Sequence, residues 1–321
     1  MRWPARAEDP GTMRKSPTRA TATARGAAVA EWQTWALIAA VYGGWLLAAW
    51  HADALGKPLA SIALMFMACW FMSLQHELLH GHPTRSRFVN RLLGLLPLAV
   101  WYPYDLYRQS HLAHHQDELL TQPGIDPESN YIHADDHARL PACLRWMWVA
   151  QRTVIGRVVL GPAMVIVPTW LDIVRRPWRG DFTQTRLWAQ HLLLLAALLW
   201  ALDRYAGIGP LHYMLVVGYP ALGLAMLRSF YEHRPSADPA HRVVINEAGW
   251  FWRLLYLNNN YHAVHHELPS LPWYLIRKHY LVERDAILRR NGGFLLSGYA
   301  ELLQRYAVEP VDSPVHPPHH P

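Results

Sequence analysis

The stretch LASIALMFMACWFMSLQHELLHGH, residues 59–82, decides the fold. Its first part, Leu59–Leu74, carries no charged residue and comes close to the length that crosses a bilayer as a helix. If the helix continues, His76 and His80 lie four residues apart on one face, where two imidazoles can ligate one metal ion. The stretch therefore predicts a membrane helix that presents metal ligands at its end.

Three further segments have the composition of membrane-spanning helices. Trp32–Trp50, Leu187–Leu202 and Pro210–Leu227 contain almost exclusively apolar and small residues, and none includes a charged side chain. With residues 59–74 they predict four spans. Leu92–Tyr104 is also apolar but too short to cross, which favours an interfacial or re-entrant element.

Histidine is the unusual residue of this chain, with 20 copies, many of them clustered. Beyond residues 76–82, two segments share the form HxxHH: HLAHH at 111–115 and HAVHH at 262–266. Spacings of three and four place these side chains on one helical face. The candidate metal ligands are His76, His80, His111, His114, His115, His262, His265 and His266, with His233 at the end of the fourth span as a ninth. So many ligands predict two ions with four or five imidazoles each. Imidazole suits Fe, Zn, Cu and Ni, and spacing does not choose among them.

A shared metal site constrains the membrane topology. All clusters must lie on one membrane face, so an even number of crossings separates the first cluster from His233. Thr153–Val174 is long enough to span but contains Arg157, and a crossing there would make the number odd. We therefore expect this segment to lie along the membrane or to dip into it. Basic residues before the first span predict a cytoplasmic N-terminus and a cytoplasmic site in the cell (inner) membrane.

The composition of the chain narrows the class of protein and its division into parts. The 321 residues are 52% hydrophobic, with a net charge of +6, and the basic residues form no stripe interleaved with aromatics, which argues against nucleic-acid binding. The 2 cysteines, Cys69 and Cys143, lie outside the histidine clusters and form no disulfide framework. We expect an all-α integral membrane protein with a cytoplasmic helical cap. Its parts are a disordered basic tail at 1–30, a catalytic domain at 31–305 and a disordered Pro/His-rich tail at 306–321.

The motifs HELLHGHPT, YRQSHLAHH and DPESNY resemble those of the membrane fatty acid desaturase/hydroxylase superfamily, in particular bacterial DesA-like fatty acid desaturases. The similarity extends over roughly residues 32–280. The resemblance implies two iron ions held by the three histidine motifs, O2 as co-substrate, and formation of a double bond in an acyl chain. It also implies a further histidine between the fourth span and the last motif, a position that His233 fills.

The resemblance also has implications for partners. No HPGG motif is present, so no fused cytochrome b5 domain is expected. Electrons would come from a separate ferredoxin- or rubredoxin-type donor and its reductase, and the basic cytoplasmic surface suits an acidic donor. Two alternatives stay open: a di-iron hydroxylase or ketolase acting on an alkane, lipid or carotenoid, and a histidine-rich metal transporter. A transporter would be expected to carry ligands near the bilayer midplane, and these spans carry almost none.

Several polar residues adjoin the predicted ligands. A carboxylate often accepts the second ring N–H of a metal-bound histidine, which makes Glu77, Asp117, Glu232 and Glu267 candidates for that role. Ser229 and Asn260 are candidates for holding a metal-bound water. Candidates for an acidic head group, or for pairing with these carboxylates, are Arg85, Arg108 and Arg228. His82 has no clear place in the pattern.

Overall fold

The computed structural model describes residues 31–115 and 119–317; the predicted N-terminal tail and Asp117 lie outside these ranges. Within them the chain is helical apart from one short parallel pair, β1 (Ile245–Asn246) with β2 (Leu295–Leu296). The helices of the first half are α2 (Trp32–Trp50), α3 (Ala52–Leu55), α4 (Lys57–Leu79), α5 (Arg87–Gly94), α6 (Tyr104–His114), α7 (Ala134–Arg139), α8 (Ala142–Ala150) and α9 (Val154–Val159). Those of the second half are α10 (Gly161–Trp178), α11 (Thr185–Ala206), α12 (Pro210–His212), the π-helix η2 (Tyr213–Gly218), α13 (Tyr219–Arg228), the 3-10 helix η3 (Pro239–Arg242), α14 (Trp250–Leu255), α15 (His262–Glu267), α16 (Trp273–Arg290) and α17 (Tyr299–Tyr306).

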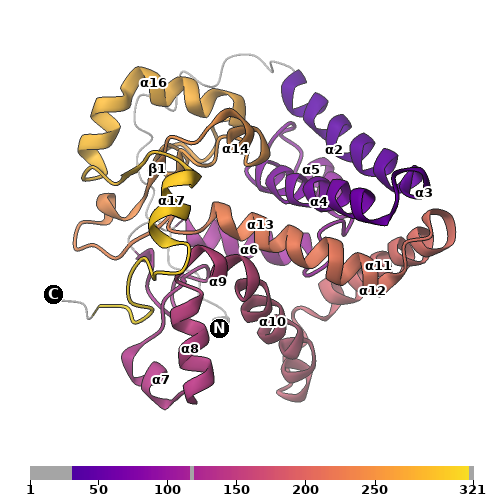
Figure 1. Cartoon of the computed structure of the whole chain (residues 1–321), viewed down its shortest axis with the longest axis horizontal. Coiled ribbons are helices and arrows are strands. Elements are labelled where there is room, and N and C mark those ends of the chain that lie inside the picture. Colours follow the sequence, from indigo (N-terminus) through magenta and orange to yellow (C-terminus); the bar gives the residue numbers. More distant parts are fainter. Residues whose placement is uncertain (1–30, 116–118, 318–321) are drawn as a thin grey trace.

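Helix α4 is the centre of the apolar part of the molecule. It packs against α2 on one side and against η2 and α13 on another, as Figure 1 shows. Leu37, Val41 and Trp45 of α2 are buried, whereas Leu46 and Leu47 are more than half exposed. Because large apolar side chains on an outer surface match lipid better than water, this surface is the one expected of membrane helices.

Among the described residues, four helical segments are long and apolar enough to cross a membrane: Lys57–Leu79, Val154–Trp178, Thr185–Ala206 and Pro210–Arg228. Three of them contain spans predicted from the sequence. The fourth contains the segment that the sequence predicted to be interfacial, and in the structure it consists of α9 and α10. Helix α2 has the bounds predicted for the first span but, with its several tryptophans, is not among the four.

The connection between α5 and α6, residues 95–103, is a buried irregular segment in place of a helix. Leu98 and Val100 are almost fully buried, and their carbonyl groups accept hydrogen bonds from side chains of the surrounding helices. Tyr213 donates to Leu98 O at 2.9 Å, and His191 Nε2 lies 2.7 Å from Val100 O. Irregular backbone is tolerated at membrane depth only where protein satisfies its polar groups, so this arrangement fits the re-entrant element expected here.

A cap of short helices covers one end of the bundle. Figure 1 shows α14, α16 and α17 on this side together with the β1–β2 pair, opposite the turn between α11 and α12. The chain after α17, expected to be part of a disordered tail, lies against the cap in the structure up to Pro317. Ile132 N donates to Pro314 O at 2.9 Å, and Asp312 accepts hydrogen bonds from Tyr131 and Arg152. The C-terminal segment therefore holds Tyr131, Ile132 and Arg152.

Candidate metal centre

The first pair of histidines stands at the end of a membrane helix. Helix α4 continues past the predicted Leu74 to Leu79, so His76 lies in its last turn and His80 is its C-cap residue. Their imidazole centroids are 4.8 Å apart. The sequence does this because QHELL contains neither Gly nor Pro, and the helix continues until Gly81 and Pro83 end it.

The second motif lies at the end of α6. His111 and His114 occupy the last turn of α6, and His115 follows as its C-cap residue. His111 and His114 are almost fully buried, 1% and 3% exposed, while the polar residues Arg108 and Gln109 precede them toward the outside. An amphipathic helix that buries Tyr104 and Leu106 therefore turns its histidines inward.

The third motif is a helix of its own, α15, with His262 at its first position and His265 and His266 in its last turn. His233 lies beyond the end of α13 and pairs with Val243 through an isolated antiparallel bridge. Because Ala263 N donates to Val244 O at 3.0 Å, the same segment that holds His233 also anchors the start of α15.

The histidines converge into two groups. One consists of His76, His80, His111 and His265, and the other of His114, His233, His262 and His266; within each group one ring nitrogen of every histidine lies within 4.8 Å of the others. His115 belongs beside the first group, since its Nε2 is 3.0 Å from Nε2 of both His111 and His265. The structure thus brings together all nine histidines predicted as ligands.

The ring nitrogens of neighbouring histidines face each other at distances that suit a shared cation. Nε2 of His233 lies 3.0 Å from Nε2 of His114 and 3.1 Å from Nε2 of His262. A neutral imidazole that donates through Nδ1 has a lone pair on Nε2, and lone pairs that face each other repel unless a positive charge lies between them. The donor set, neutral nitrogens converging in a buried pocket, therefore fits two metal ions.

Two carboxylates that the sequence analysis missed orient these rings. His114 Nδ1 lies 2.8 Å from Asp126 Oδ1, and His111 Nδ1 lies 3.2 Å from Glu128 Oε1. Asp126 is fixed in turn, because it accepts hydrogen bonds from the backbone N–H groups of Thr121 and Glu128. A carboxylate on Nδ1 fixes the tautomer and makes Nε2 a better ligand. Both residues belong to DPESNY, a motif quoted above without a role for its acids.

The residues expected to support the site have different outcomes. Glu232 lies 3.7 Å from His262 Nδ1, and Glu77 lies 4.0 Å from His76 Nδ1 and also accepts a hydrogen bond from Trp273 N. Glu267 instead pairs with Arg290 at the surface. Beside the rings stands Asn259, whose Oδ1 is 3.2 Å from His262 Nδ1, whereas Asn260 donates to Asn246 O. The side chain of His82 pairs with Glu31 at 2.7 Å and takes no part in either group.

The pKa values of the histidines also fit a metal site. Burial and neighbouring histidines lower the pKa of His262, His265 and His266 well below 6.5, so these ligands are neutral. For His114, burial acts in the same direction, but Glu128 and Asp126 outweigh it and raise its pKa to about 9. The two carboxylates that stabilise a positive charge on His114 would also stabilise a metal ion bound to its Nε2.

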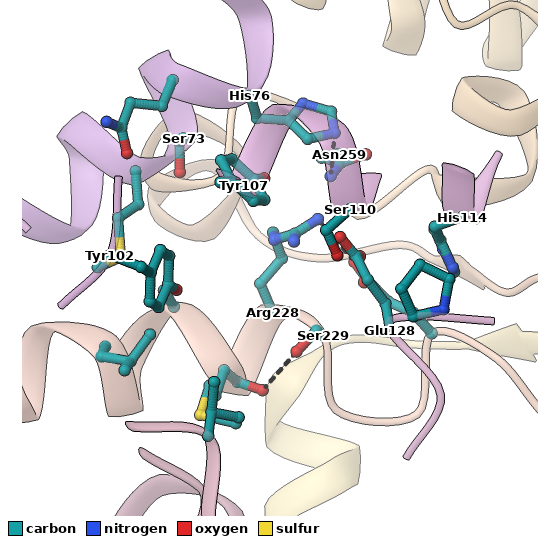
Figure 2. A pocket seen from close by; sticks show the side chains of 18 of the residues that line it. Ser73, His76, Tyr102, Tyr107, Ser110, His114, Glu128, Arg228, Ser229 and Asn259 are labelled. Carbon is teal, nitrogen blue, oxygen red and sulfur yellow. Dashed lines mark hydrogen bonds and ion pairs between the residues drawn. The ribbon is translucent and has the colours of Figure 1, made fainter. Parts of the chain in front are cut away.

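A cavity of about 200 Å³ opens beside the second group. His76, His114 and His233 form part of its wall, and α4, α6, α10 and α13 supply most of the rest. Figure 2 shows Arg228 reaching into this space from α13, with Tyr107, Ser110 and Glu128 around its guanidinium group. Of the predicted head-group arginines, Arg228 lies in the cavity, Arg85 is exposed and Arg108 lines a separate surface groove.

Fold and site define the class as a helical membrane protein that carries a buried dinuclear histidine metal centre. A comparison with protein families extends this, because the fatty acid desaturase family matches residues 54–295. The match covers all three histidine motifs and most of the chain, and the chain belongs to this family of oxidoreductases. No curated protein matches the sequence.

Proposed function

We propose that this chain is an O2-dependent, non-haem di-iron desaturase of the acyl-lipid, DesA-like kind, which introduces a double bond into an aliphatic chain. The observation that carries the proposal is the convergence of the histidines into two groups at the end of membrane helices. The nine histidines suffice for two ions, with His115 as a fifth ligand beside the first group.

The donor set of the two groups supports iron over a structural zinc site. Each group consists of imidazoles alone, whereas structural zinc sites are closed, four-coordinate and often include cysteine. Imidazole also suits iron, and the family to which the chain belongs consists of oxidoreductases.

The groups of the chain have separate tasks in this reaction. Bound iron would supply the redox chemistry, in which O2, two electrons and two protons remove two hydrogens from adjacent carbons and give two water molecules. Asp126 and Glu128 keep His114 and His111 oriented, and Asn259 holds the ring of His262. The apolar part of the cavity, with Leu106, Leu222 and Met226, is suited to aliphatic carbons and excludes water.

Both histidine groups must lie on one membrane face, and the basic residues before the first span favour the cytoplasmic face. His76 and His233 lie in the same centre, so an even number of crossings separates them. The segment Thr185–Ala206 and the segment Pro210–Arg228 form an antiparallel pair joined by a three-residue turn. We therefore propose that Val154–Trp178, which contains Pro168 and Pro177, runs along the membrane or only dips into it. A separate ferredoxin- or rubredoxin-type donor with its reductase would deliver electrons to the cytoplasmic side.

The test is coexpression with a ferredoxin and its reductase, followed by mass spectrometry of lipids and free acids. A desaturase gives products that have lost two hydrogens, whereas a hydroxylase gives products that have gained one oxygen atom. Cells that contain the His262→Ala variant provide the background. Metal accumulation without any oxidised product would favour the transporter alternative and contradict the proposal.

A further inference from the structure

The wall of the cavity beside the metal centre carries hydrogen-bond donors without partners. Within residues 31–115 and 119–317, the hydroxyl groups of Tyr102, Tyr107 and Ser110 form no hydrogen bond, although all three line the cavity. The guanidinium group of Arg228 has one hydrogen bond there, from Nη1 to Glu232 Oε1 at 3.2 Å. A cavity for a hydrocarbon alone needs none of these groups, because polar groups cost free energy when an apolar ligand covers them.

The two acids of the cavity already have partners. Glu128 lies against His111 Nδ1 through both of its oxygens, at 3.2 and 3.3 Å. Glu232 accepts from Arg228 and lies near His262 Nδ1. The groups left over can all donate hydrogen bonds, and Arg228 can only donate, so a molecule that supplies acceptors satisfies all of them. Two metal ions behind the histidines would add further positive charge on this side.

Arg228 is placed to be the main anchor. It is the last residue of α13, and its side chain is only 16% exposed. Figure 2 shows its guanidinium group directed into the cavity, between Tyr107 and Glu128. An arginine fork binds a carboxylate with two parallel hydrogen bonds, and Nη1 alone is engaged by Glu232, so donors are left over for a ligand.

We propose that this cavity binds the carboxylate of a free carboxylic acid, with Arg228, Tyr102, Tyr107 and Ser110 as its donors. The acid group then shares one cavity of about 200 Å³ with His76, His114 and His233. The carbons close to the carboxylate, and not those in the middle of a long chain, are brought to the metal centre. This inference rests on the proposed desaturase function and changes its substrate from an esterified acyl chain to a free acid, and it names the end of the molecule that reacts.

Binding is measured on the full-length, metal-loaded protein in a neutral detergent, under anaerobic conditions and without an electron donor, so that no turnover occurs. The probes are tritiated dodecanoate, methyl dodecanoate and dodecyl phosphate. Loss of charge-assisted hydrogen bonds weakens binding by roughly 10- to 100-fold, so we expect that preference for the acid over its ester. Equal affinity for acid and ester contradicts the proposal, and tighter binding of dodecyl phosphate contradicts the carboxylate assignment.

Variants locate the binding group. In Arg228→Met the preference for the acid disappears, in Arg228→Lys part of it returns, and Tyr107→Phe weakens binding of the acid while leaving the ester unchanged. Arg91→Met is the matched control, since Arg91 also pairs with an acid, Asp105, but lies outside the cavity. An unchanged preference in Arg228→Met and Tyr107→Phe would overturn the inference. If one variant folds poorly, the other still tests it.

Regiochemistry separates this inference from the proposed function. With acids of different length, the oxidised position stays constant when it is counted from the carboxylate. A position that stays constant from the methyl end would contradict the anchor while leaving the desaturase assignment intact. Selective acid binding with no oxidised product would support the anchor and contradict the desaturase assignment.

Discussion

His114 Nδ1 lies 2.8 Å from Asp126 Oδ1, and both side chains are only 3% exposed. Asp126 is also the acceptor for two backbone N–H groups, those of Thr121 and Glu128. The loop after the second histidine motif is therefore built around the carboxylate that orients a ligand of the second group. This contact links the folding of the loop to the affinity of the metal centre.

Asp126→Asn replaces one acceptor oxygen by an NH2 group, which donates hydrogen bonds and cannot accept them. We expect metal affinity at the second group to fall about 10- to 100-fold, as is usual when such a partner of a metal-bound histidine is changed. Titration with a competing chelator measures this. Asp135→Asn, at an exposed position of α7, is the control. Equal metal retention in the two variants would show that Asp126 does not support the ligand.

Asp312→Ala tests the C-terminal segment. Asp312 accepts hydrogen bonds from Tyr131 Oη at 2.6 Å and Arg152 Nε at 2.7 Å, and the side chain of Arg152 is 2% exposed. Removing the partner of a buried charge costs about 3–5 kcal/mol, so we expect a clear drop in Tm. The exposed pair Arg305 with Glu301 is the comparison, and Arg305→Ala should cost less than about 1 kcal/mol. Similar Tm changes for both variants would contradict a holding role for the segment.

His191→Leu tests the buried segment between α5 and α6. It removes the side chain that lies 2.7 Å from Val100 O, and a buried carbonyl left without a donor costs about 1–3 kcal/mol. We expect a lower Tm in detergent and partial recovery in His191→Gln, which restores a donor. If His191→Leu unfolds at the same temperature as the wild type, another group satisfies the carbonyl.

The proposed topology can be tested with the native cysteines. Cys143 is exposed in α8 and Cys69 is buried, so a membrane-impermeant maleimide should label Cys143 from the cytoplasmic side alone. In a Cys143→Ser background, Arg179→Cys after α10 should label from that side and Leu211→Cys from the opposite one. Labelling of Arg179→Cys from the side opposite to Cys143, with Leu211→Cys labelled from the cytoplasmic side, would mean that Val154–Trp178 crosses the membrane.

The histidines could be predicted from the sequence because their spacing and helical geometry are local. His76 and His80, or the members of each HxxHH motif, share a face whatever surrounds the helix. His233 was predicted from its position at the end of the fourth span, and the family resemblance implied a histidine there as well, although its bridge to Val243 could not be predicted. The division into two groups mixes residues from α4, α6 and α15, and no spacing along the chain encodes such a mixture.

The supporting residues were harder to predict because they depend on tertiary contacts. Asp126 lies 12 residues after His114, in a loop with no periodic pattern. Asn259 precedes His262 by 3 residues, and Asn258 to Asn260 are chemically alike, so only the backbone conformation decides which of them reaches the ring. The position of residues 307–317 likewise depends on Arg152 and Tyr131, far earlier in the chain.

The central claim is that the two histidine groups hold two iron ions. The most direct test is elemental analysis with Mössbauer spectroscopy on protein purified from cells grown with ⁵⁷Fe. The account predicts about two high-spin iron ions per chain, in accordance with the two groups, and loss of iron loading and activity in His114→Ala and in His262→Ala. A stoichiometric content of zinc in place of iron, or full iron content with full activity in either variant, would contradict it.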